Sequence, residues 1–392
     1  MEERTRAYLR GRFRDFYRRS SPAEPPGAAQ REWGYIPWTE GPDSTMIRHR
    51  SAYDLGDLGD FLRRERPRHV YFSAGYYEDP SARQMAEKGW QGSDLVFDID
   101  ADHLPGVDPA ADSYESMLAS SKDALLDLLD LLETDFGFGD LRVVFSGGRG
   151  YHVHVRDESV RRTERAQRRE IVDYVRGNGL SLESLVTKRA VGGRGRKTPT
   201  TQRTIPIDGG WGRRVVSHIE SFVKELLTLE EDDALSRLRE IDGVGEKNAR
   251  AILNVVRENT EEVTRGNVDV HPAFLPVARE MVERAVIEDA SPIDEPVTTD
   301  THRLIRLPGS LHGGTGLRVV PLDRDSIEAF DPLSDAVPET FVGHEIAVEV
   351  TETRTVSLRG ETLSVTPGNI TVPEYAGIFL MTRGWAEKAR EP

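Results

Sequence analysis

The sequence predicts an α+β fold (mixed α/β), and three observations support it. Strand-like runs lie early and late in the chain, and a long, polar, helix-patterned stretch over residues 216–285 separates them. Strands and helices do not alternate regularly, as they would in a doubly wound sheet. The composition, 37% hydrophobic and 30% charged, is that of a folded protein with a sizeable core.

The first half of the chain supplies four predicted elements in order. Residues 1–20 form an Arg-rich helix, which a Pro- and Gly-containing loop follows. Residues 69–73 form a strand. Residues 95–100 alternate with the period of two that marks a second strand. Leucines at helical spacing predict a helix over residues 115–133.

Later elements follow the same reasoning. The run LRVVFSGGRGYHVHV (141–155) reads as a strand, a Gly-rich turn and a strand. Residues 160–176 form a charged helix, and residues 191–200 form a basic loop. The tail contains short strands such as IAVEV and ITV, followed by a closing helix near residues 379–389.

These elements predict a division into domains. A discontinuous main domain would comprise residues 1–215 and 286–350. Residues 216–285 would form a helical insertion in it, and residues 351–392 would pack on it as strands and a helix.

The charge balance indicates the salt content of the surrounding solvent more than it indicates a binding partner. Asp and Glu number 67 against 52 Lys and Arg, for a net charge of −15, and only seven of the basic residues are lysines. Scarce lysine and excess acid are typical of proteins from a high-salt cytoplasm, where salt screens charges beyond about 3 Å. An ordinary acidic protein is the alternative. Local arginine clusters leave nucleic-acid binding open despite the negative total.

Composition also excludes several classes of protein. The chain contains no Cys, which rules out disulfides, Cys-ligated zinc, iron–sulfur clusters and a thiol nucleophile. It has no apolar run long enough for a transmembrane helix and no apolar N-terminal signal. We therefore expect a cytoplasmic protein without a membrane partner.

Asp98 and Asp100 form the first candidate site. They lie two positions apart in a predicted strand, so both side chains point to one face. Buried carboxylates roughly 6–7 Å apart repel each other unless a cation lies between them. Oxygen ligands of this kind suit Mg²⁺ or Mn²⁺. A solvated strand face is the alternative.

The Gly-rich turn around Ser146, Gly147 and Arg149 is the second candidate. Glycines let backbone N–H groups approach an anion closely, and the guanidinium of Arg149 has a geometry suited to phosphate. His152 and His154 share one face of the following strand. A plain hairpin turn with an exposed arginine is the alternative.

A third segment contains Asp294, then Arg303 and Arg306, then a Gly-rich turn with His312. Asp300 is the rival of Asp294 as a third carboxylate, and Asp294 could instead cap a turn. Together the three segments have the composition of a nucleotidyl-transfer site. Carboxylates would hold two metal ions, and arginines and histidines would neutralise a triphosphate.

The chain resembles the small, catalytic subunit of archaeal–eukaryotic DNA primases. The motifs that carry the resemblance span most of the chain in the expected order: REWGYIPW and MIRHRS (Arg31–Trp38, Met46–Ser51), HVYFSAGYY (His69–Tyr77), SDLVFDIDADH (Ser93–His103), VVFSGGRGYHVHV (Val143–Val155) and RLIRLPGSLHGGTGL (Arg303–Leu317). The acidic, Lys-poor composition suggests a haloarchaeal member. The resemblance implies a primase-type catalytic domain with an inserted helical subdomain.

The resemblance also implies roles for residues. Asp98, Asp100 and Asp294 would hold Mg²⁺ or Mn²⁺. Asp294 is preferred to Asp300 because it lies 18 residues before His312, which resembles the family spacing. The residues expected to bind the nucleotide are Ser146, Gly147, Arg149, His152, Arg306, His312, Glu32 and Arg48.

The function implied is template-directed synthesis of short primers on single-stranded DNA from ribo- or deoxyribonucleoside triphosphates, with release of pyrophosphate. The implied partner is the primase large subunit, and the implied location is the nucleoid or replication fork. Many archaeal members carry a Cys-rich zinc site between the two central motifs. This chain cannot, and we expect the helix of 115–133 to close that region by apolar packing.

Two secondary features leave alternatives open. The run Ile241–Ala249 is similar to the hairpin of helix–hairpin–helix modules, which grip DNA phosphates through backbone N–H groups; a simple tight turn is the alternative. The arginines of 161–169 form either a solvated face or a track for single-stranded DNA. Rival functions are a primase-polymerase acting mainly in primer extension or repair, a noncatalytic nucleic-acid-binding subunit, and a DxD-type sugar-nucleotide transferase.

Overall fold

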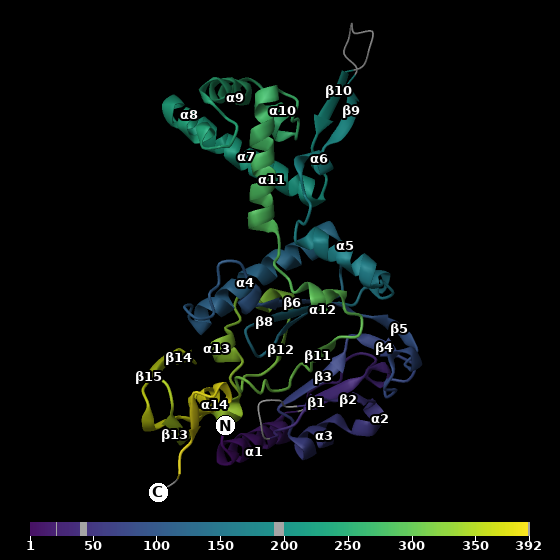
Figure 1. Cartoon of the computed structure of the whole chain (residues 1–392), viewed down its shortest axis with the longest axis vertical. Coiled ribbons are helices and arrows are strands. Elements are labelled where there is room, and N and C mark those ends of the chain that lie inside the picture. Colours follow the sequence, from purple (N-terminus) through teal and green to yellow (C-terminus); the bar gives the residue numbers. More distant parts are fainter. Residues whose placement is uncertain (21, 40–44, 192–199, 391–392) are drawn as a thin grey trace. The chain divides into compact units, whose positions relative to one another are not determined.

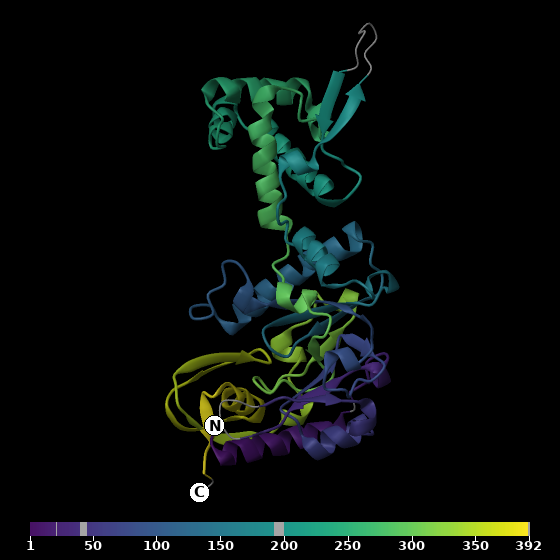
Figure 2. The ribbon, with the colours of Figure 1, turned by 45° about the vertical axis from the view of Figure 1, so that its right-hand side comes forward.

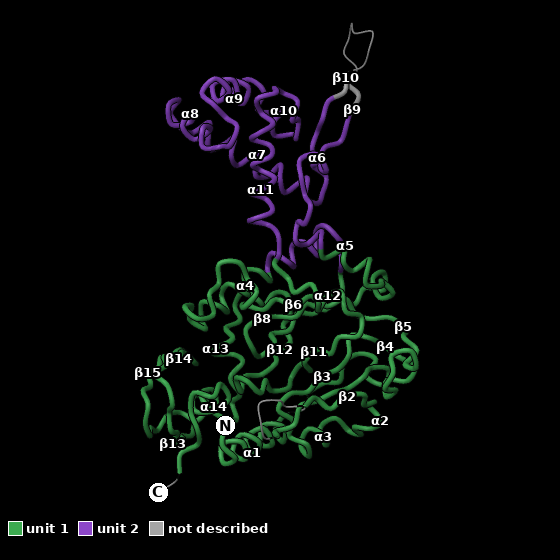
Figure 3. Tube along the Cα trace, in the orientation of Figure 1, with its two compact units in different colours: residues 1–125, 139–172, 292–392 green, residues 126–138, 173–291 purple. Residues whose placement is uncertain are grey.

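The computed structural model describes all residues except 21, 40–44, 192–199 and 391–392. The chain folds into two compact units, which Figure 3 shows in different colours. Unit 2 contains the predicted insertion, residues 216–285, and extends beyond it on both sides. Unit 1 comprises Met1–Leu125, Gly139–Val172 and Pro292–Pro392, and unit 2 comprises Leu126–Phe138 and Asp173–Ser291.

The first sheet of unit 1 has four antiparallel strands in the order β11-β3-β1-β2 (Figure 1). Its core side is built around Trp33 and Phe72, which pair across β1 and β3 and are both buried. The prediction of a strand over 69–73 is confirmed. The strands are β1 (Trp33–Ile36), β2 (Ile47–Arg50), β3 (His69–Ser73) and β11 (Leu304–Arg306); a separate ribbon pairs β4 (Gly75–Tyr77) with β5 (Trp90–Ser93).

The second sheet of unit 1 is also antiparallel, in the order β12-β7-β8-β6. Both predicted strands of 141–155 and the strand of 95–100 are confirmed. In the pairing of β6 with β8, Asp98 lies opposite His152 and Asp100 opposite Gly150. The register therefore places both acidic residues beside the Gly-rich turn. The strands are β6 (Leu95–Asp100), β7 (Leu141–Phe145), β8 (Gly150–Val155) and β12 (Val320–Leu322).

Helix α1 shows why the predicted N-terminal helix forms. Leu9, Phe13, Phe16 and Tyr17 recur at helical spacing and are buried, while charged residues occupy the other face. The helix packs on α3. Helix α1 spans Glu3–Arg19. The short helices of unit 1 are α2 (Ala52–Leu55), α3 (Leu58–Glu65), α12 (Glu295–Thr299) and α13 (Pro332–Asp335).

Two predicted helices have adjusted bounds. Helix α4 (Tyr114–Asp130) continues as a π-helical turn, Leu131–Asp135. Four leucines of α4 are buried and Leu126 is half-buried, which is the apolar packing expected there; the buried ones are Leu118, Leu125, Leu128 and Leu129. Helix α5 (Arg165–Val175) begins five residues later than predicted. A separate turn ends at Val160, whose carbonyl accepts the Thr163 hydroxyl, so the intervening residues are not helical.

The C-terminal part of unit 1 corrects one prediction. The last helix, α14, spans Glu374–Arg383 rather than residues 379–389. Gly384 ends it in the left-handed conformation, with φ of 79°, and the chain then returns as β17. The predicted strands IAVEV and ITV are confirmed within β13 and β16. The strands here are β13 (Glu345–Val350), β14 (Arg354–Leu358), β15 (Glu361–Val365), β16 (Gly368–Pro373) and β17 (Ala386–Lys388).

Unit 2 is mainly helical, as expected for residues 216–285, with α7 packed on α11 (Figure 2). A two-stranded ribbon, β9 with β10, flanks the predicted basic loop, of which residues 192–199 lie outside the described part of the chain. No helix in the described part is both long enough and apolar enough to cross a membrane. The elements are α6 (Leu182–Leu185), α7 (Gly210–Thr228), α8 (Glu231–Arg239), α9 (Glu246–Glu258), α10 (Thr260–Thr264), α11 (Leu275–Asp289), β9 (Thr187–Val191) and β10 (Thr200–Thr204).

Candidate active site

Two cavities of unit 1 bring the predicted site residues together. Strands of both four-stranded sheets line the larger, of about 510 Å³, which we call the carboxylate cavity. The smaller, of about 240 Å³, lies at the Gly-rich turn, and we call it the turn cavity. Asp100 and Arg306 line both. The carboxylate cavity also has Arg48, Tyr71, Asp98, His103, His152, Asp294, Asp300, His302 and Arg303; the turn cavity also has Ser146, Gly148, Arg149, His312, Gly314, Thr315 and Arg383.

The carboxylate cavity concentrates negative charge. Asp98 and Asp100 point from one face of β6, and Asp294 reaches them because its N–H donates to the Asp98 carbonyl at 2.9 Å. Burial first, and then repulsion from Asp100 and Asp294, raises the pKa of Asp98 to about 7. Such repulsion is relieved when a divalent cation binds the carboxylates.

The three carboxylates therefore offer the oxygen ligands that a hard metal ion such as Mg²⁺ prefers. Among the residues that the structure describes, no three His, Asp or Glu side chains already stand in an arrangement that would hold a metal. Asp300, the rival third carboxylate, also lines the carboxylate cavity, where it accepts the His302 N–H at 2.8 Å. Asp294, unlike Asp300, is among the charges that raise the pKa of Asp98.

The Gly-rich turn connects β7 with β8 and depends on its glycines. A Cβ on Gly150 would stand 1.7 Å from the Ile99 carbonyl oxygen, so only glycine allows β6 to approach there. Gly147 has a φ of 74°, and a Cβ on it would lie 2.6 Å from the Cβ of His312. Gly147 thus admits His312 to the turn and does not itself line the turn cavity.

The pKa values of the two predicted phosphate-binding histidines are lowered, which favours their neutral form. Burial, and then the charges of Arg306 and Arg303, lowers the pKa of His152 to about 3. Burial and Arg306 also hold the pKa of His312 well below its ordinary value. His152 Nε2 lies 3.3 Å from an Asp98 carboxylate oxygen, and His152 lines the carboxylate cavity but not the turn cavity. The side chains act as hydrogen-bonding groups in this state, so the positive charge comes from arginines.

His312 is oriented by its own turn. His312 Nδ1 lies 3.0 Å from the Thr315 hydroxyl and 3.3 Å from the Gly314 nitrogen, and the Thr315 hydroxyl itself donates to the Gly147 carbonyl. His312 Nε2 faces the Gly-rich turn, because a Cβ on Gly148 would stand 3.5 Å from it. His312 therefore presents Nε2 to the turn cavity.

Arg149 and Arg306 differ in how far their charge is neutralised. Arg149 pairs with Asp102 and lies 3.6 Å from Asp100. Arg306 stands over the Tyr71 ring, and its Nε is buried without a hydrogen-bond partner in the described structure. An unsatisfied buried donor is unfavourable, so Arg306 is poised for an anion.

Glu32 and Arg48 lie together, as the predicted pair should, but with different roles. Glu32 is fully buried and contacts Arg48 Nε at 3.1 Å and Lys88 Nζ at 3.3 Å. Burial alone raises the pKa of Glu32, but Arg48, the His49 N–H and Lys88 outweigh it and lower that pKa. Arg48 lines the carboxylate cavity and Glu32 does not, so Glu32 holds Arg48 in place.

Several contributors have no local sequence signal. Tyr71 and His302 line the carboxylate cavity from neighbouring strands and turns, and Arg383 reaches the turn cavity from the last helix. Only the fold brings them to the site. Arg168, one of the arginines predicted to lie on a solvated face or DNA track, is instead buried and donates to the carbonyls of Ser93 and Asp94.

The helix–hairpin–helix-like run lies in unit 2, between α8 and α9. Ile241 and Val244 are buried there, and Gly243 is exposed with a φ of 79°. This is compatible with either a phosphate grip or a tight turn, and DNA contact stays a prediction.

Comparison with known proteins gives the family. Residues 97–324 match the family described as DNA primase small subunit. The chain is 64% identical to the DNA primase small subunit PriS of Halobacterium salinarum and 60% identical to that of Haloarcula marismortui, with 100% of each chain covered. It is 41% identical to PriS of Methanococcoides burtonii over 99% of both chains. The chain belongs to the DNA primase small-subunit family, and its similarity to haloarchaeal members confirms the expectation from composition.

Proposed function

We propose that this chain is the catalytic subunit of a DNA primase that joins nucleoside triphosphates into short primers on single-stranded DNA and releases pyrophosphate. One observation carries the proposal: Asp100 and Arg306 line both cavities, so the carboxylates and the basic Gly-rich turn meet. A nucleotide with its reacting phosphate at Asp100 and its outer phosphates in the turn cavity matches the charges of both.

Asp98, Asp100 and Asp294 are the residues that would hold Mg²⁺ or Mn²⁺. The raised pKa of Asp98, caused by burial and by its acidic neighbours, supports this assignment. When bound, the ions would supply charge stabilisation to the attacking and leaving oxygens of the reaction. Cysteine-ligated zinc has no ligands in this sequence.

The protein's own groups bind and orient the nucleotide. Arg149 and Arg306 would bind phosphate oxygens, and His312 would contact the nucleotide through Nε2. Arg48, held by Glu32, adds positive charge to the carboxylate cavity. Catalysis of this kind depends on positioning and on electrostatic complementarity to the transferred phosphate.

The relatives are named small subunits, which supports a large subunit as the partner of this chain. We propose a heterodimer that acts on single-stranded template DNA with ribo- or deoxyribonucleoside triphosphates at the replication fork, in the cytoplasm. The acidic surface indicates activity at high salt.

The test is primer synthesis from labelled nucleotides on unprimed single-stranded DNA, with Mn²⁺ or Mg²⁺ in concentrated KCl, with and without the large subunit. Asp100→Asn should reduce the product by at least about 100-fold, while Asp60→Asn, on the exposed face of α3, should leave it unchanged.

Three outcomes would contradict the proposal. Extension of a supplied primer without initiation, even with the large subunit, would indicate the primase-polymerase. DNA binding that is independent of metal, with neither activity, would indicate a noncatalytic subunit. Full activity of Asp100→Asn would place the metal site elsewhere.

A further inference from the structure

Arg383 contributes to the turn cavity from an unexpected part of the chain. It lies in the last turn of α14 (Figure 1), and lines the turn cavity with Ser146, Arg149 and Arg306. The helix end and the Gly-rich turn are more than 230 residues apart in sequence, so no motif marks the residue.

Aromatic rings fix the guanidinium of Arg383 in place. Its Cζ lies 4.3 Å from the ring centre of Tyr114, 5.1 Å from that of Phe379 and 5.4 Å from that of Trp385. Cations are attracted to aromatic faces at such distances. The Tyr114 hydroxyl also donates to the Gly148 carbonyl, which ties the same ring to the Gly-rich turn.

The charge of Arg383 is not neutralised by the protein. Within the described residues Arg383 forms no ion pair with a carboxylate, and its Nε and Nη2 are buried without a hydrogen-bond partner. Arg149, by contrast, faces Asp100 and Asp102. A rigidly held guanidinium with unsatisfied buried N–H groups is a site for an anion, and its forked donors suit phosphate.

The residues that the turn cavity shares with its neighbouring cavities show at which end of it Arg383 lies. The turn cavity shares Asp100 and Arg306 with the carboxylate cavity. It shares Arg149 and Arg383 with a third cavity of about 450 Å³. Arg383 therefore lies at the end of the turn cavity away from the paired carboxylates.

We propose that Arg383 binds the terminal phosphate of the incoming nucleoside triphosphate and so makes the site select triphosphates. The direction in which the nucleotide lies rests on the proposed function. The presence of an anion subsite at Arg383 rests on the unsatisfied Nε and Nη2 of its guanidinium and on its place in the turn cavity.

The test measures the dissociation constants of phosphate compounds for the wild-type chain and for Arg383→Gln. Ca²⁺ replaces Mg²⁺ so that no turnover occurs. The probes are a nucleoside triphosphate, the matching monophosphate and inorganic tripolyphosphate. We expect about 10- to 100-fold weaker binding of the triphosphate and of tripolyphosphate, and monophosphate binding within about twofold of wild type. Arg383→Lys, which keeps the charge but loses the fork, should fall between the two.

Arg354→Gln is the matched control. Arg354 also stands over the Trp385 ring, at 4.9 Å, but it pairs with Glu352 and lies outside the turn cavity. It should bind all three probes like wild type. The melting temperature of each variant shows whether its fold is intact. If Arg383→Gln does not fold, the comparison of Arg383→Lys with wild type decides the test.

The outcomes separate this inference from the proposed function. Arg383-dependent binding of tripolyphosphate by a chain that makes no primers would retain the subsite and reject the primase activity. Equal losses for triphosphate and monophosphate, unchanged triphosphate binding by both Arg383 variants, or no tripolyphosphate binding by wild type would overturn the subsite.

Discussion

At the scale of single residues, lowered pKa values of two histidines leave the positive charge of the site to its arginines. His152 and His312 have the residue identities expected for phosphate contacts, but burial and the nearby Arg306 lower the pKa of both. That histidines help to neutralise a triphosphate stays a prediction, and these lowered pKa values argue against it for the protein without a nucleotide. The histidines provide directed hydrogen bonds, and the arginines provide the charge, because a guanidinium stays protonated where an imidazole does not.

The third carboxylate can be identified by a pair of substitutions. Asp294→Asn should lower primer synthesis by about 100-fold or more, because it removes a charge that acts directly on Asp98. Asp300→Asn should lower it by less than about threefold, because Asp300 accepts the His302 N–H and is not among the charges that raise the pKa of Asp98. Initial rates over a range of Mn²⁺ concentrations measure both. The reverse ranking would transfer the assignment to Asp300.

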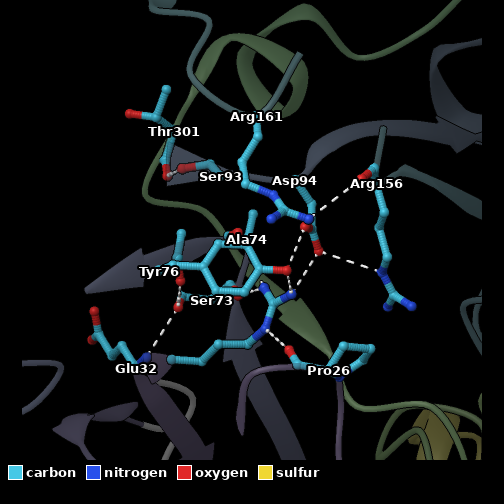
Figure 4. Close-up of polar contacts among 12 residues, drawn as sticks. Pro26, Glu32, Ser73, Ala74, Tyr76, Ser93, Asp94, Arg156, Arg161 and Thr301 are labelled. Atoms are coloured by element: carbon cyan, nitrogen blue, oxygen red, sulfur yellow. Dashed lines mark hydrogen bonds and ion pairs between the residues drawn. The ribbon is translucent and has the colours of Figure 1, made fainter. Parts of the chain in front are cut away.

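At the scale of elements, a buried ionic network holds the start of strand β6 (Figure 4). Arg31 and Asp94 are both fully buried and pair at 2.8 Å, and the Tyr76 hydroxyl donates to Asp94 at 2.9 Å. Arg31 also donates to the Ser73 carbonyl at the end of β3. The network thus joins the first sheet to the residue that precedes the strand of Asp98 and Asp100.

Breaking this network should destabilise the fold. Asp94→Asn leaves Arg31 buried and uncompensated, and we expect a loss of about 3–5 kcal/mol in the free energy of unfolding. Asp60→Asn breaks an exposed pair, Arg63–Asp60 at 2.6 Å, and should cost less than about 1 kcal/mol. Denaturant unfolding in concentrated KCl provides the comparison. A similar small loss for both would mean that solvent or a rearranged partner satisfies Arg31.

At the scale of the whole molecule, the net charge of −15 predicts dependence on salt. Repulsion among excess carboxylates destabilises the folded chain at low ionic strength, and concentrated salt screens it. The melting temperature should rise by at least about 5 °C between about 0.2 and 3 M KCl. Sucrose at matched osmolality is the control. An equal rise in sucrose, or no rise in KCl, would show that charge screening is not the cause.

The sequence by itself determined the strands that carry the site, because their alternation and the glycines between them are local properties. It also determined Asp98 and Asp100, whose spacing places both on one strand face, and the Gly-rich turn with Ser146 and Arg149. The sequence pattern placed the last helix several residues too late. The hydrophobic periodicity does not mark the end of this helix, which Gly384 terminates.

Only the tertiary structure showed how distant residues complete the site, including Asp294, which the sequence had already named. Asp294 meets Asp98 through a backbone hydrogen bond, and Arg383 reaches the Gly-rich turn from the last helix. The charge states of His152 and His312 also depend on burial and on neighbours far along the chain. Spacing along a strand follows from local geometry, whereas contact, burial and the resulting pKa depend on how the elements pack, which no local pattern encodes.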